Sequence, residues 1–290
     1  MPFGMRYHPQ AIVLNGKVYL GGGKSEKSTQ VMMYDPRHEL WALLPAYQFE
    51  LFAMTVVDDQ LVLVGGEDTH TKRKTNVLGA WDEKLCYWTH PFPPMLTACS
   101  SPTVITYQNS WLVVAGGSGD GGDLFIVEVM DISNDHWYSA PPLPIPVSKM
   151  SATIIDNNTM VVMGGASGYY FFKKVFKVNV DDLVSQALAQ QTTAIKKSPT
   201  AVPAQTPWQK LPDTPLTQST TVTLNGALLA VGGQGGTGIH LYHPDSRSWV
   251  KAGDMPMERM QCACTALPNG EVLIAGGANT EQLVEILTIC

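Results

Sequence analysis

Short apolar runs that end in a pair of glycines recur six times along the chain. The six copies are KVYLGGG, LVLVGGE, LVVAGGS, VVMGGAS, LLAVGGQ and VLIAGGA. The first glycines of the aligned pairs are Gly22, Gly65, Gly116, Gly164, Gly232 and Gly276, at intervals of 43, 51, 48, 68 and 44 residues. Intervals of about 40 to 50 residues are typical of chains built from one repeated supersecondary unit. The pattern therefore predicts six such units across residues 1–290.

A second marker follows four of the glycine pairs. An aromatic or apolar residue precedes a tryptophan by seven positions in the pairs Tyr34/Trp41, Trp81/Trp88, Met130/Trp137 and Tyr242/Trp249. Asp, Pro, Asn and Ser lie between the two, and these residues favour tight turns. Each unit therefore reads as four strands: two joined by a turn and ending in Gly-Gly, a polar loop, and two more joined by a tight turn.

Six four-stranded antiparallel sheets with this period predict an all-β protein, a six-bladed β-propeller that spans residues 1–290 as a single domain. The combination of Gly-Gly, an aromatic residue and Trp resembles the Kelch repeat, and the resemblance covers essentially the whole chain. Glycine tolerates positive φ and allows close approach of backbone where blades converge. Tryptophan supplies a large apolar wedge between sheets.

The fourth unit departs from the period, because its tryptophan is delayed to Trp208. The inserted residues, about 181–207, begin with two Asp that can cap a helix. Leu183, Val184, Ala187 and Leu188 share one helical face. We expect a single helix followed by a Pro/Thr-rich tail, on the face opposite the Gly-Gly loops, that serves as surface decoration or as an interaction arm.

The sixth unit stops early. The chain ends at residue 290, before the position of a Trp strand, and it begins with the phrase MPFGMR, which resembles MPMERM at residues 255–260. We therefore expect the last blade to lack its fourth strand in this chain, either because the chain was cut from a longer protein or because that blade has three strands.

Composition restricts the classes of partner. The chain is 44% hydrophobic and 15% charged, as in ordinary globular proteins, and its net charge of -6 disfavours nucleic acid and anionic membranes. Neither a membrane span nor a signal peptide is recognised. Five cysteines are an odd number without a disulfide framework, so we expect a reducing, cytoplasmic location. The isolated domain is expected to be monomeric.

Binding residues are expected on the face that carries the loops between strands 2 and 3 and between strands 4 and 1, because rigid scaffolds commonly present function on such loops. In Kelch proteins this face resembles the usual partner-binding surface, where an Arg after the Met-Pro phrase reaches acidic peptides. The candidates are Arg6, Arg259, Glu50, Lys149, Tyr169, Tyr170, Arg73 and Asp120. Because only Arg6 and Arg259 match the Arg position in six blades, a mixed peptide with one acidic contact is expected. Alternatively, both arginines fix the channel mouth through hydrogen bonds to loop carbonyls.

Metal and cofactor sites are not predicted. Asp120 and Asp123 in GSGDGGD lack the carboxylate spacing of a calcium loop, so they indicate a flexible glycine turn. Cys262 and Cys264 have no neighbouring Cys/His pair and are expected to be buried as small apolar residues. The basic stretch THTKRKT, which includes Arg73, is a solvated loop tip or steers an acidic partner.

The sequence leaves two candidate functions open. The first is a protein-interaction module whose loop face binds a peptide or protein; the Kelch resemblance implies a scaffold, or a substrate receptor of a cullin-type ubiquitin ligase whose BTB domain lies elsewhere. The second is a carbohydrate-active or other small-molecule enzyme with Glu50, Arg6, His8 and Arg259 at the channel mouth. The first is preferred, because the loops do not reveal an acid/base pair with a suitable pKa.

Overall fold

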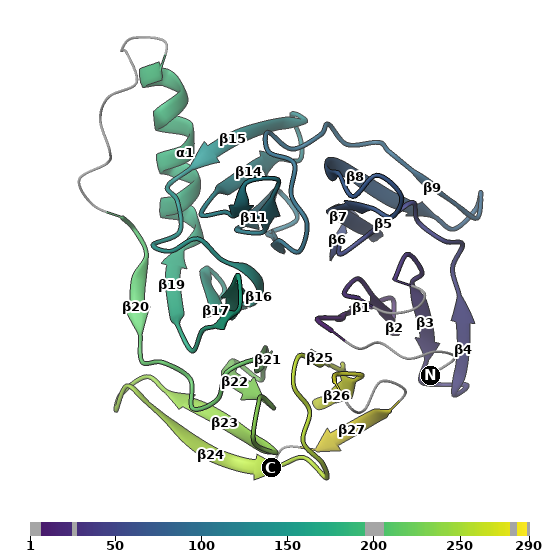
Figure 1. Ribbon diagram of the computed structural model, residues 1–290, viewed down its shortest axis with the longest axis vertical. Coiled ribbons are helices and arrows are strands. Elements are labelled where there is room, and N and C mark those ends of the chain that lie inside the picture. The colour runs from purple at the N-terminus through teal and green to yellow at the C-terminus, as the bar shows by residue number, and fades with distance from the viewer. Residues whose placement is uncertain (1–6, 25–27, 195–205, 279–282, 289–290) are drawn as a thin grey trace.

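Six antiparallel sheets are arranged as blades around a central axis (Figure 1). The computed structural model describes residues 7–24, 28–194, 206–278 and 283–288. Blade 1 contains β1 (Gln10–Leu14), β2 (Lys17–Gly21), β3 (Met32–Asp35) and β4 (Leu40–Leu43). Blade 2 contains β5 (Phe49–Glu50), β6 (Ala53–Val57), β7 (Gln60–Asp68), β8 (Lys74–Asp82) and β9 (Tyr87–Thr89). Blade 3 contains β10 (Thr103–Tyr107), β11 (Trp111–Ala115), β14 (Val127–Asp131) and β15 (His136–Ala140), with a small hairpin of β12 (Ser118–Gly119) and β13 (Gly122–Asp123).

The second half of the ring repeats this order with one insertion. Blade 4 contains β16 (Ser148–Ile155), β17 (Thr159–Ser167), β18 (Tyr170–Phe171), β19 (Val175–Asn179) and β20 (Gln209–Leu211). Blade 5 contains β21 (Thr220–Leu224), β22 (Ala227–Val231), β23 (Gly238–His243) and β24 (Ser248–Asp254). Blade 6 contains β25 (Ala263–Ala266), β26 (Glu271–Ala275) and β27 (Val284–Thr288). The predicted six-bladed all-β propeller is confirmed.

Blade 6 has three strands among the described residues, as the sequence predicted for this chain. Residues 1–6 and 289–290, which that prediction also concerned, lie outside the described residues.

The core lies between adjacent blades. Val62 and Val64 on the second strand of blade 2 share one buried cluster with Leu112 and Val114 of blade 3. Both faces of a sheet thus lose contact with water, which explains why the apolar runs before each Gly-Gly are continuous instead of alternating.

The glycine pairs permit close contact between blades. The first glycine of every pair has φ between 63° and 70°, a region that non-glycine residues rarely adopt. A Cβ atom at Gly116 would lie 2.3 Å from the carbonyl oxygen of Val147, in the next blade. The next amide, that of Gly117, donates a hydrogen bond of 2.9 Å to the same oxygen. Each pair is therefore a contact point between blades as well as the end of a strand.

The predicted helix in blade 4 is present as α1 (Val180–Ala194), between β19 and β20. Leu183, Val184 and Ala187 are buried as predicted, but Leu188 is 37% exposed. The side chain of Asn179 accepts the amide of Asp182 (3.1 Å) and so caps the helix, a role the sequence had suggested for the aspartates. Asp181 instead accepts the hydroxyl of Tyr107 in blade 3 (2.7 Å). This bond ties α1 to the neighbouring blade.

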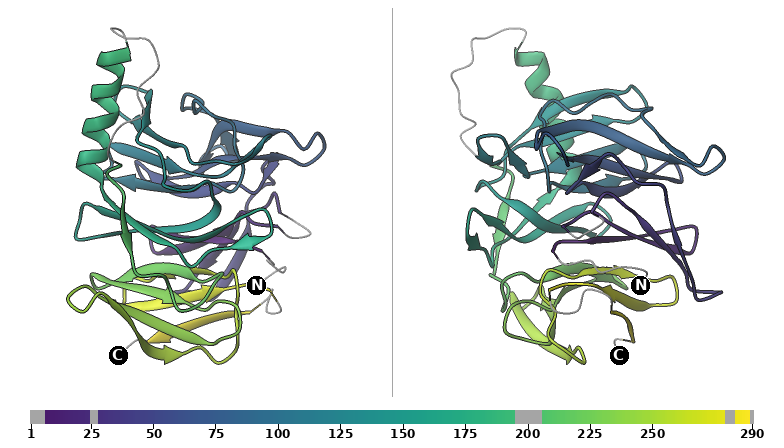
Figure 2. Two further views of the ribbon diagram at one scale, coloured as in Figure 1. Left: turned by 60° about the vertical axis from the view of Figure 1, so that its left-hand side comes forward. Right: turned by 45° about the vertical axis from the view of Figure 1, so that its right-hand side comes forward.

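The far end of α1 projects beyond the blades (Figures 1 and 2). The Pro/Thr-rich part of the insertion, residues 195–205, lies outside the described residues. In the described part of the chain, α1 lacks the length and apolar character needed to cross a membrane.

Candidate functional site

One residue in each blade adopts a left-handed backbone conformation at the same place, at or just before the innermost strand. The six residues are His8 (φ 51°), Leu51 (56°), Ser101 (50°), Lys149 (59°), Gln218 (61°) and Gln261 (58°). All six line a single cavity that runs along the innermost strands in the central channel. We call them the mouth ring. A left-handed conformation costs a residue with a side chain about 1 kcal/mol or more, so six repeats of it indicate a shared structural constraint.

Backbone hydrogen bonds link neighbouring members of the mouth ring. The amide of Ser101 donates to the carbonyl oxygen of Leu51 (2.6 Å), and the amide of Lys149 donates to that of Ser101 (3.0 Å). The amide of Gln261 donates to the carbonyl oxygen of Gln218 (2.9 Å). These bonds join the members of blades 2, 3 and 4 and those of blades 5 and 6, and they fix the backbone from which these side chains project.

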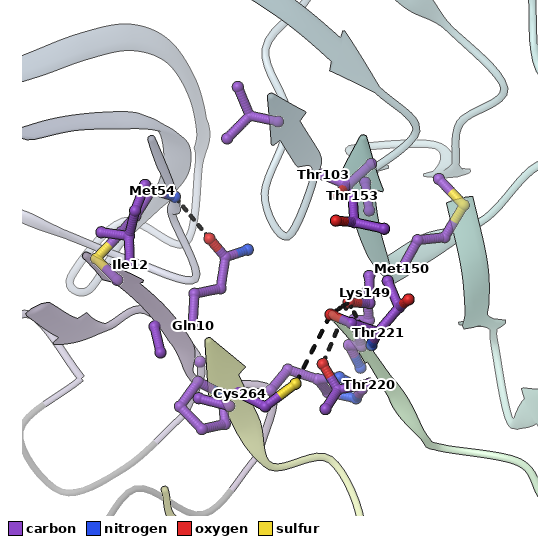
Figure 3. A pocket seen from close by; sticks show the side chains of 18 of the residues that line it. Gln10, Ile12, Met54, Thr103, Lys149, Met150, Thr153, Thr220, Thr221 and Cys264 are labelled. Carbon is purple, nitrogen blue, oxygen red and sulfur yellow. Dashed lines mark hydrogen bonds between the residues drawn. The ribbon is translucent and has the colours of Figure 1, made fainter. Parts of the chain in front are cut away.

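The cavity behind the mouth ring has a volume of about 480 Å³, and polar side chains of the innermost strands contribute much of its wall (Figure 3). Several of these groups join neighbouring blades. The hydroxyls of Thr55 and Thr106 lie 2.8 Å apart, and the side-chain oxygen of Gln10 accepts the amide of Met54 (2.6 Å). The wall thus offers hydroxyl, amide and thiol groups, including that of Cys264.

Lys149 gives the cavity its charge. The cavity-lining residues include neither Asp nor Glu, and in the described part of the chain the Lys149 ammonium has no ion-pair partner. His8 also lines the cavity, but burial, and secondarily the charge of Lys149, lowers the pKa of His8 to about 3. Its ring is therefore neutral at physiological pH, and among the described residues its buried Nε2 has no hydrogen-bond partner. The mouth consequently favours an anionic group.

Arg259 does not reach the cavity. Its side chain is fully buried, and Nη1 donates to the carbonyl oxygens of Gly276 (3.0 Å) and Leu283 (3.1 Å). Its Nε donates to Glu285 (3.1 Å). The structure thus supports the second of the two roles considered for this arginine, fixation of loop carbonyls, and corrects its placement on the partner-facing surface. Arg6 lies outside the described residues.

The residue two positions before the mouth ring belongs to the core in other blades as well. Cys99 and Val147 are buried, and the carbonyl oxygen of each accepts a hydrogen bond from the amide of the second glycine of the preceding blade. The carbonyl oxygen of Arg259 does the same. The position of the arginine in the Met-Pro phrase is therefore a core position of the repeat, not a surface position. Of the mouth ring, Lys149 and His8 were candidates from the sequence. The other members, Leu51, Ser101, Gln218 and Gln261, lie at the matching position before or at each innermost strand.

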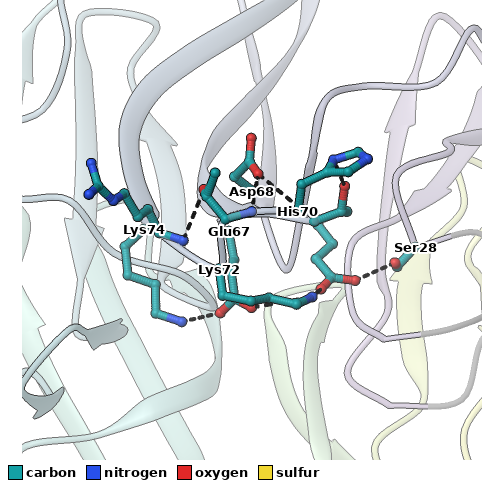
Figure 4. A network of polar contacts seen from close by, with 10 residues as sticks. Ser28, Glu67, Asp68, His70, Lys72 and Lys74 are labelled. Carbon is teal, nitrogen blue, oxygen red and sulfur yellow. Dashed lines mark hydrogen bonds and ion pairs between the residues drawn. The ribbon is translucent and has the colours of Figure 1, made fainter.

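Glu50 is also buried. It belongs to a network of polar contacts with Ser28, Lys72 and Lys74 (Figure 4). It accepts the hydroxyl of Ser28 (2.5 Å) in blade 1 and the ammonium of Lys72 (2.8 Å). Burial raises the pKa of Glu50, but the Lys72 and Ser28 bonds outweigh burial and hold it below the ordinary value. Lys74 binds Glu67 in the same network. Two lysines of the predicted basic cluster are therefore paired, and Arg73 is its exposed neighbour.

The aromatic pair on blade 4 is exposed, as predicted. Tyr169 and Tyr170 are 98% and 77% exposed at the turn between β17 and β18. Asp120 is exposed on the turn of the β12–β13 hairpin in blade 3. The two turns are joined, because the carboxylate of Asp123 accepts the amide of Gly168 (3.0 Å). The structure thus brings Asp120 and the tyrosines onto neighbouring loops, on the side of the ring that carries Lys149.

The chain is similar in sequence to parts of several known proteins. No family model matches the chain. Beta-scruin of Limulus polyphemus is 27% identical over 187 residues, which cover 56% of this chain and 19% of that protein. N-acetylneuraminate epimerase of Shigella sonnei is 27% identical over 148 residues, 48% of this chain and 34% of the epimerase. The matches therefore span well under two thirds of these relatives.

A solved structure, that of YjhT, superposes over 98% of this chain and 95% of its own with a TM-score of 0.76 and 15% identity, which is a likeness of fold. The relatives thus include an enzyme, the epimerase, and also beta-scruin. The fold is one that serves as a binding or scaffold module. With six glycine-pair strands and four tryptophan strands in register, the chain is a Kelch-type β-propeller.

Proposed function

We propose that the loop face around the mouth ring binds a peptide segment of a partner protein and holds one of its carboxylates at Lys149. The observation that carries the proposal is the unpaired ammonium of Lys149 at the rim of a cavity whose described lining has no acidic residue. A carboxylate placed there gains a charge-assisted hydrogen bond without competition from a protein carboxylate.

Two further features of this face suit a peptide. Tyr169 and Tyr170 project into solvent from the loop next to the cavity, and exposed tyrosines commonly anchor partners because they contribute large area at low entropic cost. The backbone bonds of the mouth ring hold the rim in place, so that little order has to be gained on binding. Arg73 and Asp120 extend the polar rim on blades 2 and 3.

The proposal is tested with two peptide libraries of otherwise random sequence, one with a fixed central Glu and one with a fixed central Gln. Immobilised protein is expected to retain the Glu library preferentially, with mass spectrometry as the readout. Lys149→Gln removes the charge and should reduce the preference. Lys84→Gln, an exposed lysine on the turn between β8 and β9 at the opposite face, is the matched control and should keep it in full. Equal retention of both libraries, or a preference that Lys149→Gln does not reduce, would contradict the proposal.

A second function is favoured by the cavity itself and by the likeness to an N-acetylneuraminate epimerase. N-acetylneuraminate carries a carboxylate, which Lys149 could hold, and hydroxyl groups, which could bond to the Thr-rich wall. The catalytic groups available at the cavity would be His8, Lys149 and Cys264. Proton NMR of N-acetylneuraminate with the protein decides this alternative: faster exchange between its stereoisomers, lost in Lys149→Gln, would support the enzyme.

The roles of scaffold and of substrate receptor in a cullin-type ubiquitin ligase stay predictions, as do the monomeric state and the cytoplasmic location. The library experiment addresses the step that both roles share, which is recognition of a peptide by the loop face.

A further inference from the structure

A second groove lies between blades 4 and 5, at the opposite ends of the strands from the mouth ring. Its volume is about 610 Å³, which exceeds that of the mouth cavity. The sides are formed by β19 and β20 of blade 4 and by β22 and β23 of blade 5 with the turns next to them, which Figure 1 shows side by side. Leu211 and Tyr242, which are buried, form its floor, and Gln209 and Asn225 supply amide groups.

The groove is cationic, although the protein has a net charge of -6. Lys177, Lys210 and Arg247 line it, with Asp156 as the acidic side chain and His243 beside them. Among the described residues, Lys177 and Arg247 have no ion-pair partner.

Lys210 is only weakly neutralised. Its ammonium lies 3.6 Å from Asp213, whose carboxylate binds Lys174 at 2.6 Å. Three cations therefore line a concave surface whose own carboxylate is Asp156, while Asp213 beside it is shared between Lys210 and Lys174. Such a surface attracts anionic partners.

We propose that this groove binds an acidic peptide segment of a partner protein. Glutamate or aspartate carboxylates would pair with Lys177 and with the guanidinium of Arg247, which suits planar carboxylates. The peptide backbone would meet the amides of Gln209 and Asn225. The insertion segment 195–205, which precedes β20 in the chain, is a poor occupant on charge grounds, because it contains Lys196 and Lys197 and no acidic residue.

The experiment measures fluorescence anisotropy of a fluorescein-labelled peptide that contains four glutamates, and of the same peptide with glutamines. The wild-type chain is expected to bind the glutamate peptide more tightly, with an affinity that falls as salt rises. The double variant Lys177→Gln/Arg247→Gln should weaken binding by about tenfold, the loss expected for two partly exposed charge pairs.

Two control proteins separate this groove from other effects. Arg37→Gln/Lys84→Gln removes the same charge from exposed turns of blades 1 and 2 that correspond to the turn of Arg247, and it should leave binding unchanged. The loss caused by Lys177→Gln/Arg247→Gln should be the same on a Lys149→Gln background, so failure of the mouth proposal and failure of this one are distinguishable. Circular dichroism of each variant checks that the fold is kept.

Three outcomes would overturn the proposal. The first is equal affinity for the glutamate and glutamine peptides. The second is an equal loss in both double variants, which would show attraction to the overall charge and not to the groove. The third is self-association of the chain that Lys177→Gln/Arg247→Gln abolishes, which would identify a second copy as the occupant.

Discussion

The indole Nε1–H of Trp208 donates a hydrogen bond to the carbonyl oxygen of Pro141, 3.2 Å away in the preceding blade. The same bond recurs around the ring in the pairs Trp88–Pro45 (2.8 Å), Trp137–Pro93 (3.0 Å) and Trp249–Pro212 (3.0 Å). In blades 2 to 5 the tryptophan that marks the repeat therefore joins two blades by a hydrogen bond as well as filling the space between them. The insertion that delays Trp208 leaves this bond in place.

Replacement of Trp208 by Phe should lower the free energy of unfolding by about 1 to 2 kcal/mol, because it removes the bond to Pro141 and part of a buried ring. Trp249→Phe in blade 5, where there is no insertion, should cost a similar amount. Urea unfolding followed by circular dichroism measures both. A much larger loss for Trp208→Phe would mean that the insertion has altered this contact between blades.

Gly116→Ala should lower the free energy of unfolding by more than about 2 kcal/mol, since the new Cβ atom would meet the Val147 carbonyl and the residue would keep a φ of 64°. Gly270 on the turn between β25 and β26 is the control. It also has a positive φ, of 83°, but nothing lies within 4 Å of its added Cβ. Gly270→Ala should therefore cost only about 1 kcal/mol. Equal losses of stability in the two variants would show that the contact between blades is not the reason why glycine is required at this pair.

Arg259→Ala should destabilise the protein by about 3 to 5 kcal/mol, because it leaves the partly buried Glu285 without its cation and removes the guanidinium bonds to the carbonyl oxygens of Gly276 and Leu283. Lys149→Gln should change stability by less than about 0.5 kcal/mol, because the side chain is exposed and its ammonium is not paired in the described structure. Thermal unfolding of both variants checks the assignment of one residue to the core and the other to the surface. A stable Arg259→Ala protein would contradict it.

The fold could be predicted because its markers are contacts between blades. Gly116 and Trp208 each meet the backbone of a neighbouring blade, so every repeat has to keep them, and the repeat is visible in a single sequence. The helix could be predicted from Leu183, Val184 and Ala187, whose spacing reflects one buried face. Leu188 lies at the edge of that face, which sequence spacing alone does not reveal.

The site was less predictable, because its geometry lies in the backbone. The mouth ring consists of His, Leu, Ser, Lys and Gln residues with positive φ, and apart from His none of these residue types is enriched in the left-handed conformation. Glu50 and Arg259 are charged residues, yet both are buried: Ser28 and Lys72 bind Glu50, and Glu285 pairs with Arg259. The presence of a charged side chain thus led correctly to Lys149, which lines the cavity. It did not distinguish Lys149 from Glu50 and Arg259, whose charges are paired inside the protein.

Glu50 and Glu128 should respond to pH with opposite signs. The pKa of Glu50 lies below its ordinary value of 4.5, so its contribution to stability is present above that pH and is lost as the pH falls through the folded-state pKa. Burial raises the pKa of Glu128, against bonds from Thr97 and the Leu96 amide. Its contribution is therefore present below 4.5 and is lost as the pH rises through its folded-state pKa.

Replacement by Gln separates the two carboxyls. Glu50→Gln should lower the urea midpoint at about pH 7, with a loss that shrinks as the wild-type carboxylate becomes protonated at lower pH. Glu128→Gln should raise the midpoint at about pH 7, because the amide oxygen can still accept the Leu96 amide (2.9 Å in the wild-type structure) and no charge is buried. That gain should vanish toward about pH 4, where the wild-type Glu128 is protonated. Urea midpoints measured across this range should diverge in opposite directions, and parallel curves for the two variants would show that the two environments do not differ in this way.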